Sequence, residues 1–90
     1  MRTCAAWGEP GQIVVVVVGS SSCPVFAASA VMTAPQQVVI NLGSRGGPSC
    51  TADAVETASV IAAPAGLDET KRTVLTIGKL TIELPPRVQP

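Results

Sequence analysis

The residues best suited to chemistry lie in one loop, GSRGGPSCT, which runs from Gly43 to Thr51. Glycines let backbone N–H groups approach an anion, and a helix beginning after the loop would add the positive end of its dipole. One hypothesis is therefore an anion- or nucleotide-binding loop made by Gly43, Ser44, Arg45, Gly46 and Gly47. The lysine of a Walker A loop is missing, so a flexible connection that turns at its glycines is the preferred interpretation.

Catalytic and metal-binding side chains are scarce in the rest of the chain. It contains no histidine, which is the usual acid–base group near neutral pH and the commonest metal ligand. The serines at 20–22 and the cysteines therefore have no evident base that would activate them as nucleophiles. The acidic residues are explained by the dipole of a predicted helix and by a solvated loop. We predict a non-enzymatic protein with no cofactor and no metal site.

The three cysteines, Cys4, Cys23 and Cys50, lie far apart in the sequence and match no zinc-ligand spacing. An odd number of cysteines fits reduced, buried thiols in a cytoplasmic protein better than a disulfide framework. A cytoplasmic location is therefore preferred. In an exported protein, one disulfide and one spare thiol are the alternative.

Length and charge exclude several classes of protein. Ninety residues are enough for one small domain at most. Hydrophobic residues make up 47% of the chain but aromatic residues only 2%, so few large side chains can anchor a core. Six acidic residues balance six basic ones, which is not the electrostatic pattern of a nucleic-acid-binding protein. No nucleic-acid partner is predicted.

The local patterns predict strands that alternate with helices. QIVVVVV (Gln12 to Val18) is typical of a strand buried on both faces, and QVVINL (Gln37 to Leu42) predicts a second strand. Between them, Pro24 is placed to begin a helix that ends before Pro35. A second helix is predicted from Thr51 to Ala63, because apolar residues recur there at helical spacing. Its apolar stripe comprises Ala54, Val55, Ala58, Ile61 and Ala62.

The stretch TVLTIGKLTIELPP predicts a β-hairpin from Arg72 to Leu84. Gly78 and Lys79 separate two strand-like runs, and glycine in the first turn position is typical of a type II′ turn. If Ile77 pairs with Leu80, the hairpin has one nearly apolar face, which we expect to pack on the second helix.

Together these elements predict a small α/β or α+β fold, a β-α-β-α-β-β sandwich. The single domain is expected to cover residues 12–85, after a flexible N-terminus at 1–11 and before a disordered tail at 86–90. The order of strand and helix signals carries this expectation.

The N-terminal third has alternative interpretations. The stretch from Ile13 to Met32 has no charged residue, as in a membrane span, but the polar GSSSCP segment interrupts it. Residues 1–30 also carry small-residue sites typical of signal-peptide cleavage. Met32 is a further candidate start, since a compact fold is expected from there on. Incorporation of this third into the core is preferred over a signal peptide or a membrane anchor.

An open sheet edge is a template for pairing with another chain. We therefore expect a small interaction or structural module that binds a protein partner, or a second copy, through the hairpin edge. Leu80, Ile82 and Leu84 are expected to set the register of that contact. The alternatives are the anion-binding loop, and an exported or membrane-anchored small protein.

Overall fold

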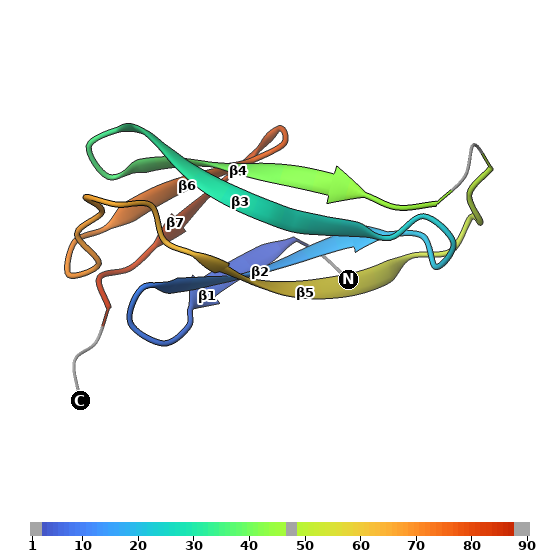
Figure 1. The fold of residues 1–90 in the computed structure, drawn as a ribbon, viewed down its shortest axis with the longest axis horizontal. Helices are drawn as coiled ribbons and strands as arrows, with labels where there is room; N and C mark the ends of the chain where they lie inside the picture. Colours follow the sequence, from blue (N-terminus) through green and yellow to red (C-terminus); the bar gives the residue numbers. More distant parts are fainter. Residues whose placement is uncertain (1–2, 47–48, 88–90) are drawn as a thin grey trace.

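The computed structural model describes residues 3–46 and 49–87 of the chain. This part contains seven strands and no helix: β1 (Cys4–Trp7), β2 (Gln12–Gly19), β3 (Val25–Ala34), β4 (Gln37–Ser44), β5 (Val55–Ala62), β6 (Thr73–Ile77) and β7 (Leu80–Leu84). Sheet A has the order β1-β2-β5 and sheet B the order β3-β4-β6-β7. The two sheets lie face to face as the two layers of a sandwich (Figure 1).

The chain passes from one layer to the other three times, after β2, after β4 and after β5. Neighbouring strands are antiparallel except β4 and β6, which pair in parallel from Gln37 with Val74 to Ile40 with Ile77. Parallel neighbours cannot be joined by a tight turn. The chain therefore leaves sheet B after β4, forms β5 at the edge of sheet A, and returns for β6.

The core lies between the sheets and is set by alternation along β2. Ile13, Val15 and Val17 are buried, whereas the valines between them are only half-buried. The predicted strand at Gln12 to Val18 is confirmed, but it is buried on one face rather than two. Its inward side chains belong to one cluster with residues of sheet B, which include Val38, Ile40, Leu75, Ile77 and Leu84.

The predicted helix from Thr51 to Ala63 is wrong, because Val55–Ala62 form strand β5. Thr57, Ser59 and Ile61 are less exposed than their neighbours, at every second position, whereas Ala58 is exposed. Two of these three inward side chains are polar, so β5 does not show the alternation of apolar and polar residues that is typical of a strand. Its outward residues include alanines and valines, which is why the apolar residues of this segment recur at helical spacing. The β-branched residues of the segment are the better guide, since they favour strands.

The predicted helix after Pro24 is also wrong. Val25–Ala34 form β3, whose pairing with β4 shifts register between Ala27 and Ser29 and again between Met32 and Ala34. Such irregularities add a residue to one strand and disturb its alternation, so no period of two is visible in the sequence. With both helices replaced by strands, the predicted α/β or α+β fold of β-α-β-α-β-β order is wrong, and the chain is an all-β sandwich.

The predicted hairpin and its register are confirmed. β6 pairs with β7 from Ile77 opposite Leu80 to Thr73 opposite Leu84. A type II′ turn requires positive φ at its first central residue and negative φ at its second. Gly78 has φ 61°, and Lys79 is not among the residues with positive φ, since Gln36 is the only such non-glycine residue in the described ranges. The apolar face of the hairpin packs into the core between the sheets, not on a helix.

Arg87 ties the two ends of the described chain together. Its guanidinium pairs with Glu69, with 2.6 Å between Nη2 and Oε1, and the two side chains are only 13% and 19% exposed. It also donates hydrogen bonds to the carbonyls of Gly8 and Glu9 and lies over the Trp7 ring, 5.2 Å from the centroid. The turn after β1 is thereby fixed to the segment after β7.

Described residues lie in both segments outside the predicted domain. Cys4–Trp7 form strand β1 inside the segment predicted to be flexible, and Arg87 lies in the segment predicted to be a disordered tail. Residues 1–2 and 88–90 lie outside the described residues. Over the described ranges, no helix has the length and apolar character needed to cross a membrane.

The strand structure of Val55–Ala62 places Ala58 outside and Ser59 toward the core, whereas the predicted helix placed Ala58 on its apolar stripe. Ala58→Asp should change the free energy of unfolding by no more than about 0.5 kcal/mol, because Ala58 is exposed. Ser59→Asp should cost about 1–3 kcal/mol, because Ser59 is half-buried and its Oγ accepts a hydrogen bond from the Ala27 N–H at 3.3 Å. Urea denaturation of both variants measures the difference. A larger loss of stability in Ala58→Asp than in Ser59→Asp would contradict the strand and support the predicted helix.

Candidate functional site

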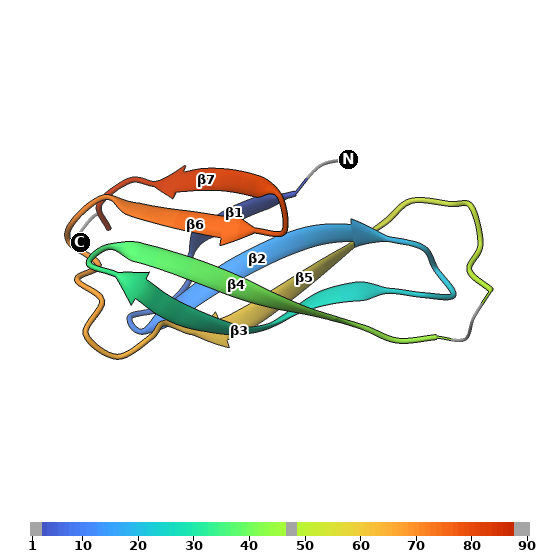
Figure 2. The same ribbon diagram turned by 90° about the horizontal axis from the view of Figure 1, so that it is seen from above.

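The two sides of the sandwich are closed to different degrees. On one side, edge strand β3 lies against edge strand β5, and the Ala27 N–H donates to Ser59 Oγ across the gap. On the other side, edge strands β1 and β7 lie next to each other (Figure 2). A groove of about 440 Å³ opens between them, lined by Thr3, Cys4, Ala5, Leu80 and Ile82.

The groove is closed at one end. Trp7 Nε1 donates a hydrogen bond to the Pro85 carbonyl at 2.7 Å, which joins the end of β1 to the residue after β7. The guanidinium of Arg87 covers the same indole ring. Cys4 and Leu80, at the starts of their strands, line the open part. The two edges are therefore fastened together at one end and apart at the other.

Hairpin geometry decides which backbone groups of β7 are free. Residues that flank a two-residue turn form a hydrogen-bonded pair, and such pairs alternate with non-hydrogen-bonded pairs along the hairpin. Ile77 and Leu80 flank the turn, so Leu80, Ile82 and Leu84 direct their N–H and C=O groups to β6. The N–H and C=O groups of Thr81 and Glu83 consequently point away from β6, along the open edge of sheet B.

The three residues predicted to form the interaction edge have different surroundings. Leu80 is 45% exposed and Ile82 is half-buried, and both line the groove. Leu84 is 2% exposed and belongs to the core. Only Leu80 and Ile82 are therefore available to a partner, and the groove adds Cys4 and Ala5 from β1, which no local pattern in the sequence associates with β7.

Few charges protect this edge. Glu83 forms an exposed ion pair with Arg72, with 3.8 Å between Nη1 and Oε2, and such surface pairs contribute little to stability. Lys79 lies in the turn itself. Natural sheet edges are usually blocked by charges, prolines or bulges, and between Leu80 and Leu84 only Glu83 is charged.

The predicted anion-binding loop has lost part of its physical basis. Among the described residues, no helix follows Gly43, Ser44, Arg45 and Gly46, so no helix dipole is directed at them. The Arg45 N–H donates to the Pro24 carbonyl at 3.1 Å, and its guanidinium lies 5.5 Å from the centroid of the Phe26 ring. Gly47 lies outside the described residues. Anion binding here stays a prediction.

The cysteines are paired differently from the preferred interpretation. Cys23 and Cys50 form a disulfide, and Cys4 is a free, exposed thiol. Reduced, buried thiols are therefore the wrong prediction, and one disulfide with a spare thiol is the right one. The odd number of cysteines, which was the argument for reduced thiols, is accounted for by the unpaired Cys4, and the spacing of cysteines alone does not encode their pairing.

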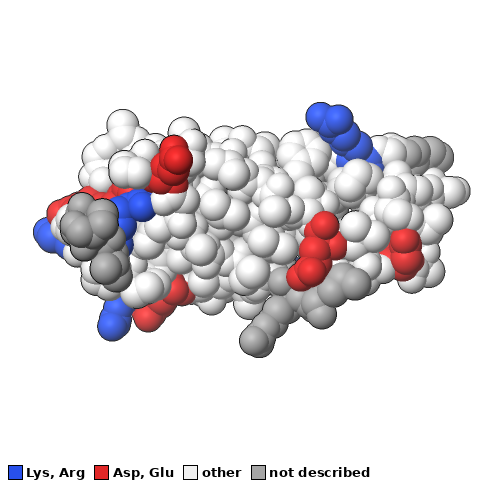
Figure 3. All heavy atoms as spheres, turned by 90° about the horizontal axis from the view of Figure 1, so that it is seen from below, with Lys and Arg blue, Asp and Glu red and all other residues white. Residues whose placement is uncertain are grey.

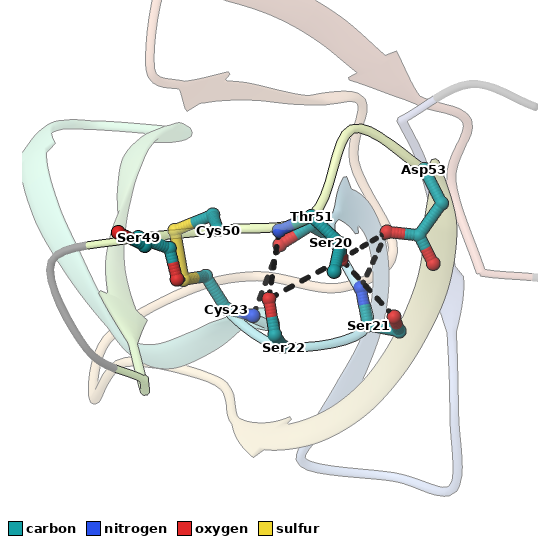
Figure 4. The surroundings of a disulfide bond; sticks show 8 residues. All are labelled: Ser20, Ser21, Ser22, Cys23, Ser49, Cys50, Thr51 and Asp53. Atoms are coloured by element: carbon teal, nitrogen blue, oxygen red, sulfur yellow. Dashed lines mark hydrogen bonds between the residues drawn. A yellow bond between two sulfur atoms is a disulfide. The ribbon is translucent and has the colours of Figure 1, made fainter.

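Hydroxyl groups surround this disulfide at the end of the sandwich (Figure 4). Ser22 Oγ accepts a hydrogen bond from the Thr51 N–H at 2.8 Å, and Ser20 Oγ accepts one from the Cys23 N–H at 2.9 Å. Asp53 Oδ1 accepts from the Ser21 N–H and from the Thr51 hydroxyl. The Ser22–Thr51 and Ser21–Asp53 bonds join the loop after β2 to the segment before β5, and the other two bonds hold each segment in shape. The cluster is therefore explained as a structural clasp rather than a catalytic site.

The clasp predicts an unusual acidity. Hydrogen bonds from the Ser21 and Thr51 side chains lower the pKa of Asp53 to about 2. Because this pKa is depressed in the folded protein, the stabilisation is present above the ordinary pKa of 3.8 and is lost as pH falls through about 2. A carbon-13 NMR titration of the carboxyl group should give a midpoint near 2, and Thr51→Val should raise it. A midpoint near 3.8 in the unmodified protein would contradict the clasp.

Known proteins add nothing to the definition of these sites. In the comparisons, no family model, no curated protein and no solved structure matches the chain. Function has to be inferred from the geometry of the described residues.

Proposed function

We propose that this chain is a small, non-enzymatic β-sandwich module that binds an extended segment of a protein partner at the β7 edge. The observation that carries the proposal is the free backbone edge of β7 beside an apolar groove. Main-chain groups of Thr81 and Glu83 supply affinity for any extended strand, and Leu80 and Ile82 supply pockets for alternate side chains.

The shape of the groove sets the kind of partner. A bound strand would continue sheet B beyond β7 and cover the groove from outside. Because the groove is closed at Trp7 and Pro85, the partner strand is limited to the length of Leu80–Leu84. Side chains at every second position of the partner would face Leu80 and Ile82, so apolar residues are expected there and uncharged or polar residues between them.

The disulfide supports an exported location for this module. Disulfides form and persist in oxidising compartments and are rare in the cytosol. Cys23 and Cys50 join the loop after β2 to the segment before β5, and closing a loop of this length stabilises a small domain by about 3–4 kcal/mol. The proposal therefore replaces the preferred cytoplasmic location with the secreted alternative.

A proline substitution tests the β7 edge. Peptides selected from a displayed library of random pentamers with flanking glycines should show apolar residues at alternate positions, and Thr81→Pro should weaken their binding about tenfold or more. Proline removes the outward N–H that the partner needs, and it is tolerated on an edge strand. Fluorescence anisotropy with labelled peptides measures the affinity.

Two further variants separate loss of the edge from loss of the fold. Thr81→Val keeps the N–H and removes only the hydroxyl, so it should bind like the unmodified protein. Thr76→Pro should unfold the hairpin, because β6 is paired on both sides. Binding that survives Thr81→Pro unchanged, or selected peptides with no alternation, would refute the proposed function.

A further inference from the structure

Strand β1 presents a second free backbone edge beside β7. The Gly8 N–H donates to the Gln12 carbonyl at 3.0 Å, and the backbone groups of successive residues in a strand point to opposite sides. Cys4 and Ala6 therefore direct their N–H and C=O groups to β2, in step with Gly8. Those of Ala5 point away from β2, along the open edge of sheet A, where β1 is the outermost strand.

The free backbone groups on the two edges belong to residues whose side chains point in opposite directions. Ala5 lies opposite Val15, which is completely buried, so the Ala5 side chain faces the core. Thr81 and Glu83 are exposed on the outer face of sheet B. On β1 the free groups thus belong to an inward residue, and on β7 they belong to outward residues.

This difference allows one strand to pair with both edges. Directly paired residues place their side chains on the same face. A strand beside β7 would therefore bond to it through residues with outward side chains, opposite Thr81 and Glu83. The residues between them would have inward side chains and would point their backbone groups away from β7. Those inward residues are the kind that Ala5 can pair with.

The spacing and direction of the two edges also suit one inserted strand. Facing sheets lie about 10 Å apart and neighbouring strands about 4.8 Å apart, so a strand between the two edges is at pairing distance from both. β1 and β7 run in the same direction, from the open part of the groove at Cys4 and Leu80 to the closed end at Trp7 and Pro85 (Figure 2). A single strand can therefore be antiparallel to both, which is the more stable pairing.

Charge has little part in recognition at this groove. None of the five residues that line it is charged. On the sheet A side of the molecule, the charged side chains lie in separate places and form no single patch (Figure 3). Six acidic residues balance six basic ones in the whole chain. The occupant that matches the groove is therefore an uncharged segment that offers backbone groups and apolar side chains.

We propose that the bound segment enters the groove and pairs with β7 and β1 at once, antiparallel to both, and so closes this side of the sandwich. The inference rests on the proposed function and adds a second backbone contact to it. Outward residues of the segment bond to Thr81 and Glu83, and its inward residues cover Leu80 and Ile82 and bond to Ala5. Amides of both alternating sets are then used, whereas pairing with β7 alone leaves one set in water.

A glycine-flanked pentapeptide of alternating valine and threonine, beginning with valine, is the probe. Antiparallel to β7, its first valine lies opposite Leu84 and its last opposite Leu80, so the valines face inward. N-methylation of either threonine should weaken binding about tenfold, because β7 loses a backbone hydrogen bond. N-methylation of at least one valine should weaken binding as much, because the Ala5 carbonyl loses its donor. Fluorescence anisotropy of the labelled peptide measures the affinity.

Ala5→Pro tests the same contact from the side of the protein. It removes the outward N–H of Ala5, and proline is tolerated on an edge strand. Probe binding should fall about tenfold, whereas Ala5→Ser, which keeps the N–H, should bind like the unmodified protein. In Ala5→Pro, N-methylation of the sensitive valine should cause little further loss, because both changes break the same pair. Matching melting temperatures establish that both variants are folded.

Trp7 reports the direction of the bound strand. It is the only tryptophan of the chain, and it lies at the closed end of the groove. A strand antiparallel to β7 begins at this end. A nitroxide label on the N-terminus of the probe should therefore quench the Trp7 fluorescence more strongly than the same label on its C-terminus.

Two results would overturn the clamp while leaving the β7 proposal intact. N-methylation could weaken binding at the threonines and at none of the valines, or Ala5→Pro could bind the probe as tightly as Ala5→Ser while Thr81→Pro does not bind it. Stronger quenching by the C-terminal label would overturn the antiparallel arrangement. The β7 proposal itself fails in a different way, in which the unmodified protein does not bind the probe or Thr81→Pro binds it unchanged.

Discussion

Every second side chain of β2 must reach the core between the sheets, and this constraint determines the other face of the strand as well. Ile13, Val15 and Val17 fill the core, so Val14, Val16 and Val18 are committed to the outside. In a half-exposed strand of an antiparallel sheet the outward residues are usually polar. Here they are valines, flanked on β1 and β5 by Cys4, alanines and Val60, with Glu56 opposite Val18. The same run of residues that builds the core thus gives β2 a second, outward apolar face.

The sandwich is held at its two ends, and its openings lie between them. At one end the Cys23–Cys50 disulfide and its hydroxyl clasp join the loop after β2 to the segment before β5. At the other end Arg87 joins the turn after β1 to Glu69 and to the segment after β7. With few large side chains in the core, covalent and ionic ties at both ends compensate for limited hydrophobic area. Between the ties, the β3 and β5 edges meet, whereas the β1 and β7 edges leave the groove.

Local sequence predicts the parts of this fold whose signal is local. The hairpin follows from Gly78 and Lys79 between two alternating runs, and β2 and β4 follow from their β-branched residues. Strand β5 could not be recognised, because Thr57 and Ser59 face inward and alanines face outward, and β3 is concealed by its register shifts. The groove brings Cys4 and Ala5 beside Leu80 and Ile82, and only the order of strands in space can establish such a contact. The Cys23–Cys50 pairing is equally non-local.

The central claim is that β7 is an open edge of a sandwich in which β2 is a central strand, and backbone hydrogen exchange tests it most directly. Measured by NMR on Cys4→Ser at low concentration, the amides of Thr81 and Glu83 should exchange rapidly, whereas those of Ile82 and Leu84 should be protected by their bonds to β6. The amides of β2, which pairs with β1 from Ile13 to Val16 and with β5 along its whole length, should be protected from Ile13 to Val17. Uniform protection along β7, or rapid exchange at alternate residues of β2, would contradict this structure.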